Sequence, residues 1–177
     1  MRAWIPTLFA LVLATLAPAV AHAQIAVSRT AGLAPVLGVT IRGASATTFS
    51  VSTSGAVTRT SGDAIRLTTG SVRAPTISVS CGAKPNTDDC RNSHIRIYIV
   101  ATSNSGPASI TRFRVSSITN GSFDTGSPPA EGSILAFDIN PLGTKTATFN
   151  LGMDVRIVAG ATPGPDTFDY YVVAQVL

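Results

Sequence analysis

Apolar residues recur at every second position along much of this chain, and that spacing limits the folds open to it. The longest run covers residues 149–157, and residues 95–99 repeat the spacing with three isoleucines. Side chains of a strand alternate between its two faces, so each such segment has one apolar face. The chain is also rich in Thr, Ser, Val, Ile and Gly, which favours strands over helices. We therefore expect an all-β domain in which two sheets pack face to face.

Clusters of turn-forming residues separate the expected strands. The strands are predicted at 25–27, 36–41, 49–51, 65–67, 77–81, 95–100, 113–115, 135–139, 149–157 and 168–176. Many short strands with frequent turns are typical of a sandwich or barrel. Asn120-Gly121 is a strong hairpin signal, and with Ser122 it also matches an N-glycosylation acceptor. We favour the turn, because it needs no particular host.

The first 23 residues differ from the rest of the chain. Arg2 precedes an apolar run at 8–17, and Ala21 and Ala23 occupy the small-residue positions of a cleavage site. This pattern predicts a secretory signal peptide at 1–23 and one exported domain at 24–177. The apolar run is too short to cross a bilayer, which takes about 20 residues. We expect no stable membrane span and a location in the periplasm, at the cell surface or outside the cell.

The charge pattern does not suggest a nucleic-acid partner. Without Arg2 the chain keeps twelve basic residues against nine acidic ones, a net charge of +3. The basic residues are scattered instead of forming a block. We expect no nucleic-acid binding.

The two cysteines, Cys81 and Cys90, enclose eight residues, several of which are turn formers. In an oxidising compartment this pair predicts a disulfide that closes a tight loop. A loop of this size is expected to contribute about 2–3 kcal/mol to stability. A redox pair would favour Cys-x-x-Cys spacing, and a metal site would need more ligands.

Candidate catalytic and metal-binding residues are few. His94 is the single histidine after the expected leader, and no Gly-x-Ser-x-Gly motif frames a nucleophile for it. Carboxylates are paired at Asp88-Asp89 and at Asp166 with Asp169, where we interpret them as solvated turn residues. The spacing of a calcium loop is missing. We expect no catalysis, no metal and no cofactor.

Both ends of the expected domain resemble a known family. The segments that carry the likeness are Gly38–Ile41, Thr48–Ser52, Thr58–Leu67, Phe149–Val155 and Pro163–Tyr170. They resemble a family of secreted bacterial domains of unknown function that is similar to pilins of the chaperone–usher kind. The resemblance implies an immunoglobulin-like β-sandwich with a fimbrial or cell-surface role. It also implies other copies or related subunits, and a periplasmic chaperone, as partners, because such pilins lack their last strand and accept one from a neighbour.

The N-terminal arm, residues 24–34, is the candidate donor strand. Its apolar face is formed by Ile25, Val27, Ala31 and Leu33. Arg29 interrupts this face. A donated strand supplies both backbone hydrogen bonds and side chains to an open groove. The alternative is that the arm forms an ordinary first strand of a closed sandwich.

Two hypotheses for the function follow. The first is a non-catalytic secreted structural subunit of a bacterial surface appendage, such as a fimbria, that assembles by β-strand addition. The alternative is a monomeric exported binding module or adhesin with ligand-contacting loops at one end of the sandwich, for which 102–110 and 121–133 are candidates. The only Trp lies in the expected leader, but Tyr98, Tyr170 and Tyr171 remain available for sugar contacts.

Overall fold

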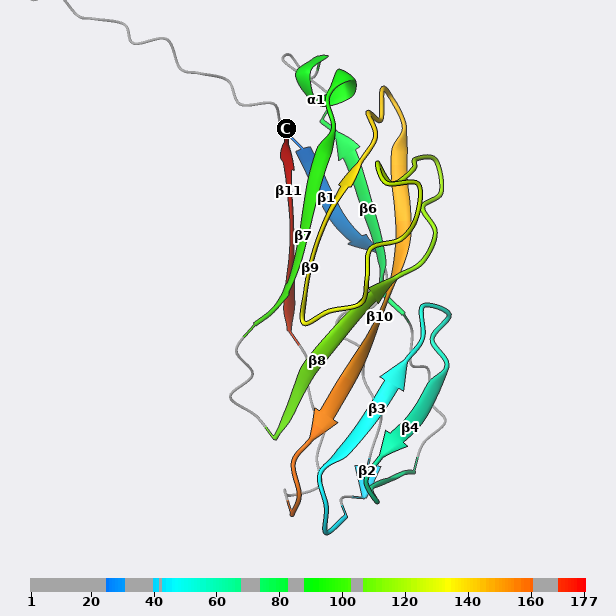
Figure 1. Ribbon diagram of the computed structural model, residues 1–177, viewed down its shortest axis with the longest axis vertical. Coiled ribbons are helices and arrows are strands. Elements are labelled where there is room, and N and C mark those ends of the chain that lie inside the picture. Colours follow the sequence, from blue (N-terminus) through cyan, green and yellow to red (C-terminus); the bar gives the residue numbers. More distant parts are fainter. Residues whose placement is uncertain are drawn as a thin grey trace, which may run out of the picture.

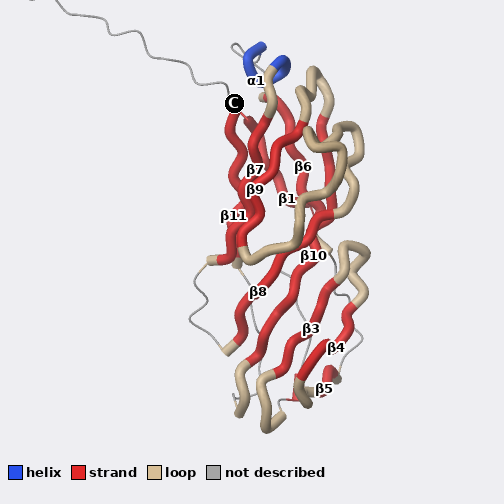
Figure 2. The backbone as a smooth tube through the Cα atoms, viewed as in Figure 1, coloured by secondary structure: helices blue, strands red, loops and turns tan. Residues whose placement is uncertain are grey.

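The computed structural model describes residues 25–30, 40–41, 43–67, 74–82, 88–102, 107–160 and 169–177. The expected leader at 1–23 lies outside these ranges, as do Ala31 and Leu33 of the candidate donor arm. Figure 2 shows that β-strands make up nearly all the regular structure of the described chain, with a short helix at one end. The predicted all-β class is confirmed.

The described elements follow one another in this order: β1 (Ile25–Thr30), β2 (Thr40–Ile41), β3 (Thr47–Val51), β4 (Val57–Ser61), β5 (Ile65–Arg66), β6 (Thr76–Cys81), α1 (Asp88–Asn92), β7 (Ile95–Ala101), β8 (Ala108–Val115), β9 (Ile134–Ile139), β10 (Thr146–Ile157) and β11 (Tyr170–Val176). The ladders between them are antiparallel. The largest sheet has the order β1-β6-β10-β3-β4, and β8 also pairs with β10. A second sheet has the order β11-β7-β9, and β2 and β5 form a small third one. Figure 1 shows β7, β9 and β11 at the end of the molecule that carries α1, with β3 and β4 at the other end.

The longest strand, β10, connects the two ends of the large sheet. Its first part, Thr146–Asn150, pairs with β6, and its last part, Met153–Ile157, pairs with both β3 and β8. Gly152 lies where β10 changes partner, and a Cβ atom there would stand 2.7 Å from the Val51 carbonyl oxygen. This close approach of two backbones requires a residue without a side chain.

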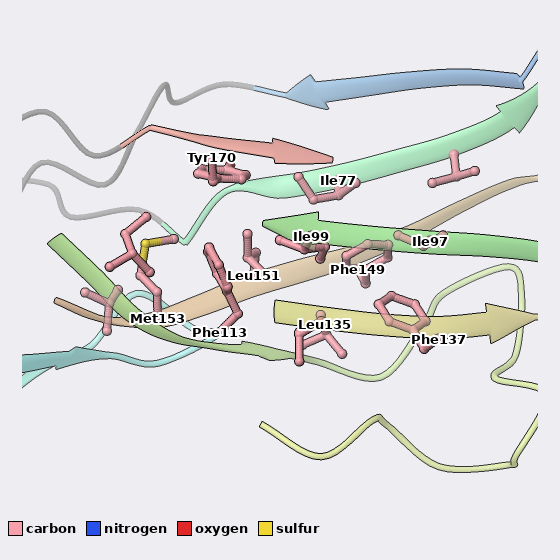
Figure 3. Packing of buried hydrophobic residues seen from close by; sticks show 14 of the residues in the cluster. Ile77, Ile97, Ile99, Phe113, Leu135, Phe137, Phe149, Leu151, Met153 and Tyr170 are labelled. Atoms are coloured by element: carbon pink, nitrogen blue, oxygen red, sulfur yellow. The ribbon is translucent and has the colours of Figure 1, made fainter. Parts of the chain in front are cut away.

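The hydrophobic core collects side chains from the two larger sheets and confirms the spacing of two. Ile95, Ile97 and Ile99 of β7 are completely buried, as their alternation predicts. Phe113 of β8 packs edge-on against Tyr170 of β11, with 5.9 Å between the ring centroids, and so joins the two sheets (Figure 3). Burying side chains of this size contributes about 1.5–3 kcal/mol each.

The predicted disulfide is present. Cys81, at the end of β6, is bonded to Cys90, with 5.7 Å between the Cα atoms. The segment that it closes is more than a turn, because its last part forms α1 and places Cys90 in the core. The two adjacent aspartates lie in the first turn of α1, where negative charge is favourable.

The predicted Asn-Gly hairpin is wrong. Asn120 does adopt a left-handed backbone, with φ of 58°. However, Thr119 bridges to Thr148 of β10, and Phe123 bridges to Ile139 of β9. The segment therefore crosses from one sheet to the other instead of turning back on itself.

Two further local predictions differ from the structure. Ile65 and Leu67 were expected to face the core, but they are 56% and 55% exposed. The strand β4 was not predicted, because it has one apolar residue, Val57, followed by polar ones. Its pairing with β3 holds it in place, so tertiary context decides its conformation.

Candidate functional site

The histidine and the carboxylates that the sequence singled out do not converge. His94 Nδ1 lies 3.2 Å from Asp124 Oδ1 at the surface, where the pair links the start of β7 to the segment after β8. The two aspartates of α1 are exposed. Asp169 directly precedes β11, and Figure 1 shows that this strand begins at its end away from α1. Asp166 lies outside the described residues. This arrangement gives no support to a two-carboxylate mechanism.

The part of the chain that the structure describes contains neither a candidate metal site nor a membrane-spanning helix. Within it, no group of three His, Cys, Asp or Glu side chains is arranged to hold a metal ion. None of its helices is long and apolar enough to span a membrane. The feature that distinguishes the structure is instead a sheet edge.

The strands β1 and β11 lie close together along one side of the molecule, and no ladder connects them. β1 is the outermost strand of the large sheet and pairs with β6, while β11 is the outermost strand of the three-stranded sheet and pairs with β7. Figure 3 shows the two strands, in the faint blue and red of the chain ends, next to each other beside the core. We refer to this pair of outer strands, 25–30 and 170–176, as the β1–β11 edge.

The core is incompletely covered along the β1–β11 edge. Apolar side chains of both strands pack against the core but are only half-buried: Ile25, Val27, Val172, Ala174 and Val176. By contrast, the core side chains Ile77 of β6, Ile97 of β7 and Leu151 of β10 are completely buried. Part of the apolar surface of these edge side chains therefore remains in contact with water. Covering the remaining apolar area would be favourable by about 25 cal/mol per Å².

Among the described strands, β7 alone pairs with the backbone of β11, along one of its two edges. At the two ends of its ladder with β7, the Thr102 amide donates to the Asp169 carbonyl at 3.0 Å and the Leu177 amide donates to the His94 carbonyl at 2.9 Å. The register then puts the odd-numbered residues of β11 in the bonded pairs, so the even-numbered residues 172–176 direct N–H and C=O groups away from β7. Among the described strands, none pairs with that second edge. Such a row of donors and acceptors is a template for another strand.

The candidate donor arm is only partly described. β1 pairs antiparallel with β6 of the same chain, and its Ile25 and Val27 pack against the core. This is the position expected of an ordinary first strand, and it does not test exchange between copies. Sequence reasoning identified the arm but not β11 as the acceptor. The available signal was the alternation over 170–176, in which Tyr171 and Val173 fall on the face opposite the core.

Comparison with known proteins identifies no relative. No family model, curated protein or solved structure matches this chain. A functional assignment therefore depends on the geometry of the β1–β11 edge and on the chemistry of the surfaces beside it.

Proposed function

We propose that this chain is a non-catalytic structural subunit of an exported surface appendage, built on an immunoglobulin-like sandwich and assembled by β-strand addition at β11. The observation that carries the proposal is the coincidence, along the β1–β11 edge, of half-buried apolar side chains with a backbone edge that no described strand covers. A strand from a neighbouring subunit would cover the first and pair with the second.

Strand order supports the immunoglobulin-like part of the proposal. The neighbours β1-β6-β10-β8 correspond to the A-B-E-D sheet of that fold, and β7 beside β11 corresponds to C beside F. In chain order these six strands also run from A to F, with β9 inserted before β10. Strand G of the fold lies beside F, which is the position of the open edge of β11. The proposed strand addition would therefore fill the strand G position of the accepting subunit.

The donor that we propose is the arm 24–34 of a second copy. In the free subunit the described part of this arm, β1, lies at an outer position and has one ladder to break. Exchange would replace that ladder with another of the same kind. The free energy of exchange therefore depends on the apolar area covered at β11 of one copy against the area that β1 uncovers at β6 of the other. Pairing of β1 with its own β6 competes with exchange, which makes assembly dependent on concentration.

The test is assembly of residues 24–177 with a pair of matched variants. Val172→Asp places a charge on the β1–β11 edge and should abolish assembly. Val158→Asp introduces the same charge at a position that is 42% exposed and lies outside this edge, and it should leave assembly intact.

Light scattering and electron microscopy measure assembly, and circular dichroism checks that each variant is folded. A synthetic 24–34 peptide should cap the edge and shorten the assemblies. The proposal would be refuted if the protein stayed monomeric at every concentration and did not bind the 24–34 peptide.

One observation favours a binding module as the second candidate. Part of the segment 121–133, a predicted ligand loop, forms the wall of a hollow on the outer face of the three-stranded sheet. That hollow lies on a different surface from the β1–β11 edge, so the two roles are compatible.

A further inference from the structure

The outer face of the three-stranded sheet is unusually apolar for a sheet surface that faces water. Two successive rows across its strands carry apolar and aromatic side chains: Tyr171–Val100–Ile134 and Val173–Tyr98–Ala136. Tyr171, Ile134 and Val173 are 62%, 59% and 55% exposed. The next row contains Gln175, Arg96 and Asp138 and is polar. An apolar surface thus borders a polar one.

A hollow of about 310 Å³ opens at this border. Tyr98 and Ala136 supply its apolar side, Arg96 and Asp138 its polar side, and Asp124, Thr125 and Pro129 the wall. The space exists because Ala136, opposite Tyr98 in the ladder, carries only a methyl group. An aromatic ring and a charged pair therefore face one small volume.

The wall of the hollow is anchored at its start. The Asp124 amide donates to the Asp138 carbonyl at 2.9 Å. The neighbouring Phe123 is buried and packs edge-on against Phe137, with 5.5 Å between ring centroids. Because backbone and core contacts hold the wall, the hollow is formed before any ligand arrives, which lowers the entropic cost of binding.

The polar side offers hydrogen bonds without a net charge. Arg96 donates from Nε to Asp138 Oδ1 at 2.7 Å and from Nη2 to Asp138 Oδ2 at 2.8 Å. The Asp138 hydrogen bond raises the pKa of Arg96, and the Arg96 hydrogen bond lowers the pKa of Asp138, so both groups stay charged at neutral pH. A guanidinium has five N–H donors and a carboxylate about four acceptor positions, so the pair has capacity for a ligand. The two side chains are 40% and 21% exposed.

Size decides between a macromolecule and a small ligand. Strands lie about 4.8 Å apart and residues about 3.3 Å along them, so the apolar rows cover only on the order of 100–200 Å². A stable protein contact needs about 800 Å² from each partner. The hollow, at about 310 Å³, falls at the lower end of small-ligand pockets. A larger hollow of about 610 Å³, lined by residues 120–122 and 140–145, has no aromatic side chain in its lining.

We propose that the hollow beside Tyr98 binds one ring of a neutral saccharide. A pyranose presents C–H groups on its faces and hydroxyl groups around its rim. Its C–H face fits the Tyr98 ring, and its hydroxyls match the donors of Arg96 and the acceptors of Asp138 and Asp124. An anionic sugar is disfavoured because Asp138 already neutralises Arg96 and Asp124 adds negative charge. Tyr171 lies diagonally across the ladder from Tyr98 and offers a second ring to a longer chain.

The test is a titration of isotope-labelled residues 24–177, observed by NMR, with cellopentaose, chitopentaose, maltopentaose and xylopentaose. At least one probe should give saturable shifts centred on residues 96–98 and 136–138, with a dissociation constant on the order of 1 mM. Tyr98→Ala should weaken binding about tenfold, the loss expected for one aromatic contact. Tyr98→Phe should retain most of the affinity, and Val158→Ala, outside the hollow, should be unchanged.

Four outcomes would overturn the proposal: no saturable shift with any probe, shifts centred on another surface, no effect of Tyr98→Ala in a folded protein, or shifts of the Tyr98 face that depend on protein concentration alone. The last would identify a second copy as the occupant. Val172→Asp should bind the sugar normally, so failure of strand addition and failure of saccharide binding are distinguishable.

Discussion

Arg114 Nη2 lies 2.6 Å from Asp154 Oδ1, and this ion pair ties β8 to β10 outside the core. The same guanidinium donates to Glu131 at 3.0 Å, to Ser50 Oγ at 2.9 Å and to the Val51 carbonyl at 3.1 Å. It therefore joins β3, β8 and β10 with the end of the segment that crosses between the sheets. The side chains of Arg114 and Asp154 are 17% and 13% exposed, so solvent screens this pair weakly.

Arg114→Met should be clearly destabilising. It removes the donors from the Asp154 carboxylate, and hydrogen bonds to charged groups are worth about 1.5–3 kcal/mol. Arg112→Met is the matched control. The Arg112 side chain is 56% exposed and its Nε lies 3.7 Å from Asp154 Oδ2. An exposed ion pair of this kind contributes less than about 1 kcal/mol to stability. Urea unfolding of both variants measures the difference. Equal midpoints would show that the Arg114 contacts are not stabilising.

Acid should weaken this network. The Arg114 hydrogen bond holds the pKa of Glu131 below its usual value of 4.5. A depressed carboxyl pKa stabilises the fold fully above the unfolded-state value, and this stabilisation is lost as pH falls through the folded-state value. Glu131→Gln should therefore lower the unfolding temperature near neutral pH and have progressively less effect below pH 4.5. A Glu131→Gln effect of the same size at pH 7 and in acid would contradict this.

Much of the fold follows from local sequence. The alternation at Ile95, Ile97 and Ile99 predicted both the strand and its buried face, because three consecutive inward positions leave one choice of orientation. The disulfide followed from the two cysteines in an exported context. The alternation of apolar residues also predicted one of the two strands of the β1–β11 edge, the arm that contains Ile25 and Val27.

What the sequence did not reveal depends on contacts between distant segments. The spacing along β10 does not say that Thr146–Asn150 pairs with β6 while Met153–Ile157 pairs with β3 and β8. Asn120-Gly121 predicts a hairpin from local sequence. In the structure the nearby Phe123 is buried against Phe137 of β9, so the chain continues to the three-stranded sheet instead of turning back. The hollow beside Tyr98 could not be predicted from local sequence either, because it depends on the register between β7 and β9 that places Ala136 opposite Tyr98.

Gly152→Ala should destabilise the protein by about 1–3 kcal/mol, the usual cost of overpacking. The added Cβ would lie 2.7 Å from the Val51 carbonyl oxygen and 2.9 Å from the Thr53 amide nitrogen, so backbone must move. Gly121→Ala is a milder control, because its Cβ would approach side-chain methyl carbons of Ala147 and Ile118 at 3.1 Å. Thermal unfolding ranks the variants. A Gly152→Ala protein as stable as the native one would show that β3 and β10 separate easily at this point.

Reduction of the Cys81–Cys90 bond should lower stability by about 2–3 kcal/mol, given a sequence separation of 9. The loss should centre on α1, because Cys90 anchors that helix in the core. Unfolding with and without dithiothreitol measures it, and a Cys81→Ala/Cys90→Ala variant should match the reduced protein and ignore the reductant. If reductant leaves the native unfolding curve unchanged, the bond does not contribute in this way.

Hydrogen exchange should show alternating protection along β11. The odd-numbered amides of Tyr171, Val173 and Gln175 face β7 in the bonded pairs and should exchange slowly. The even-numbered amides of Val172, Ala174 and Val176 point to the edge that no described strand covers, and should exchange faster in the monomer. Strand addition would protect the second set and leave the first unchanged, since a donated strand bonds only to the open edge. Uniform protection in a dilute monomer would mean that β11 is already paired on both sides, and strand addition at this edge would then be ruled out.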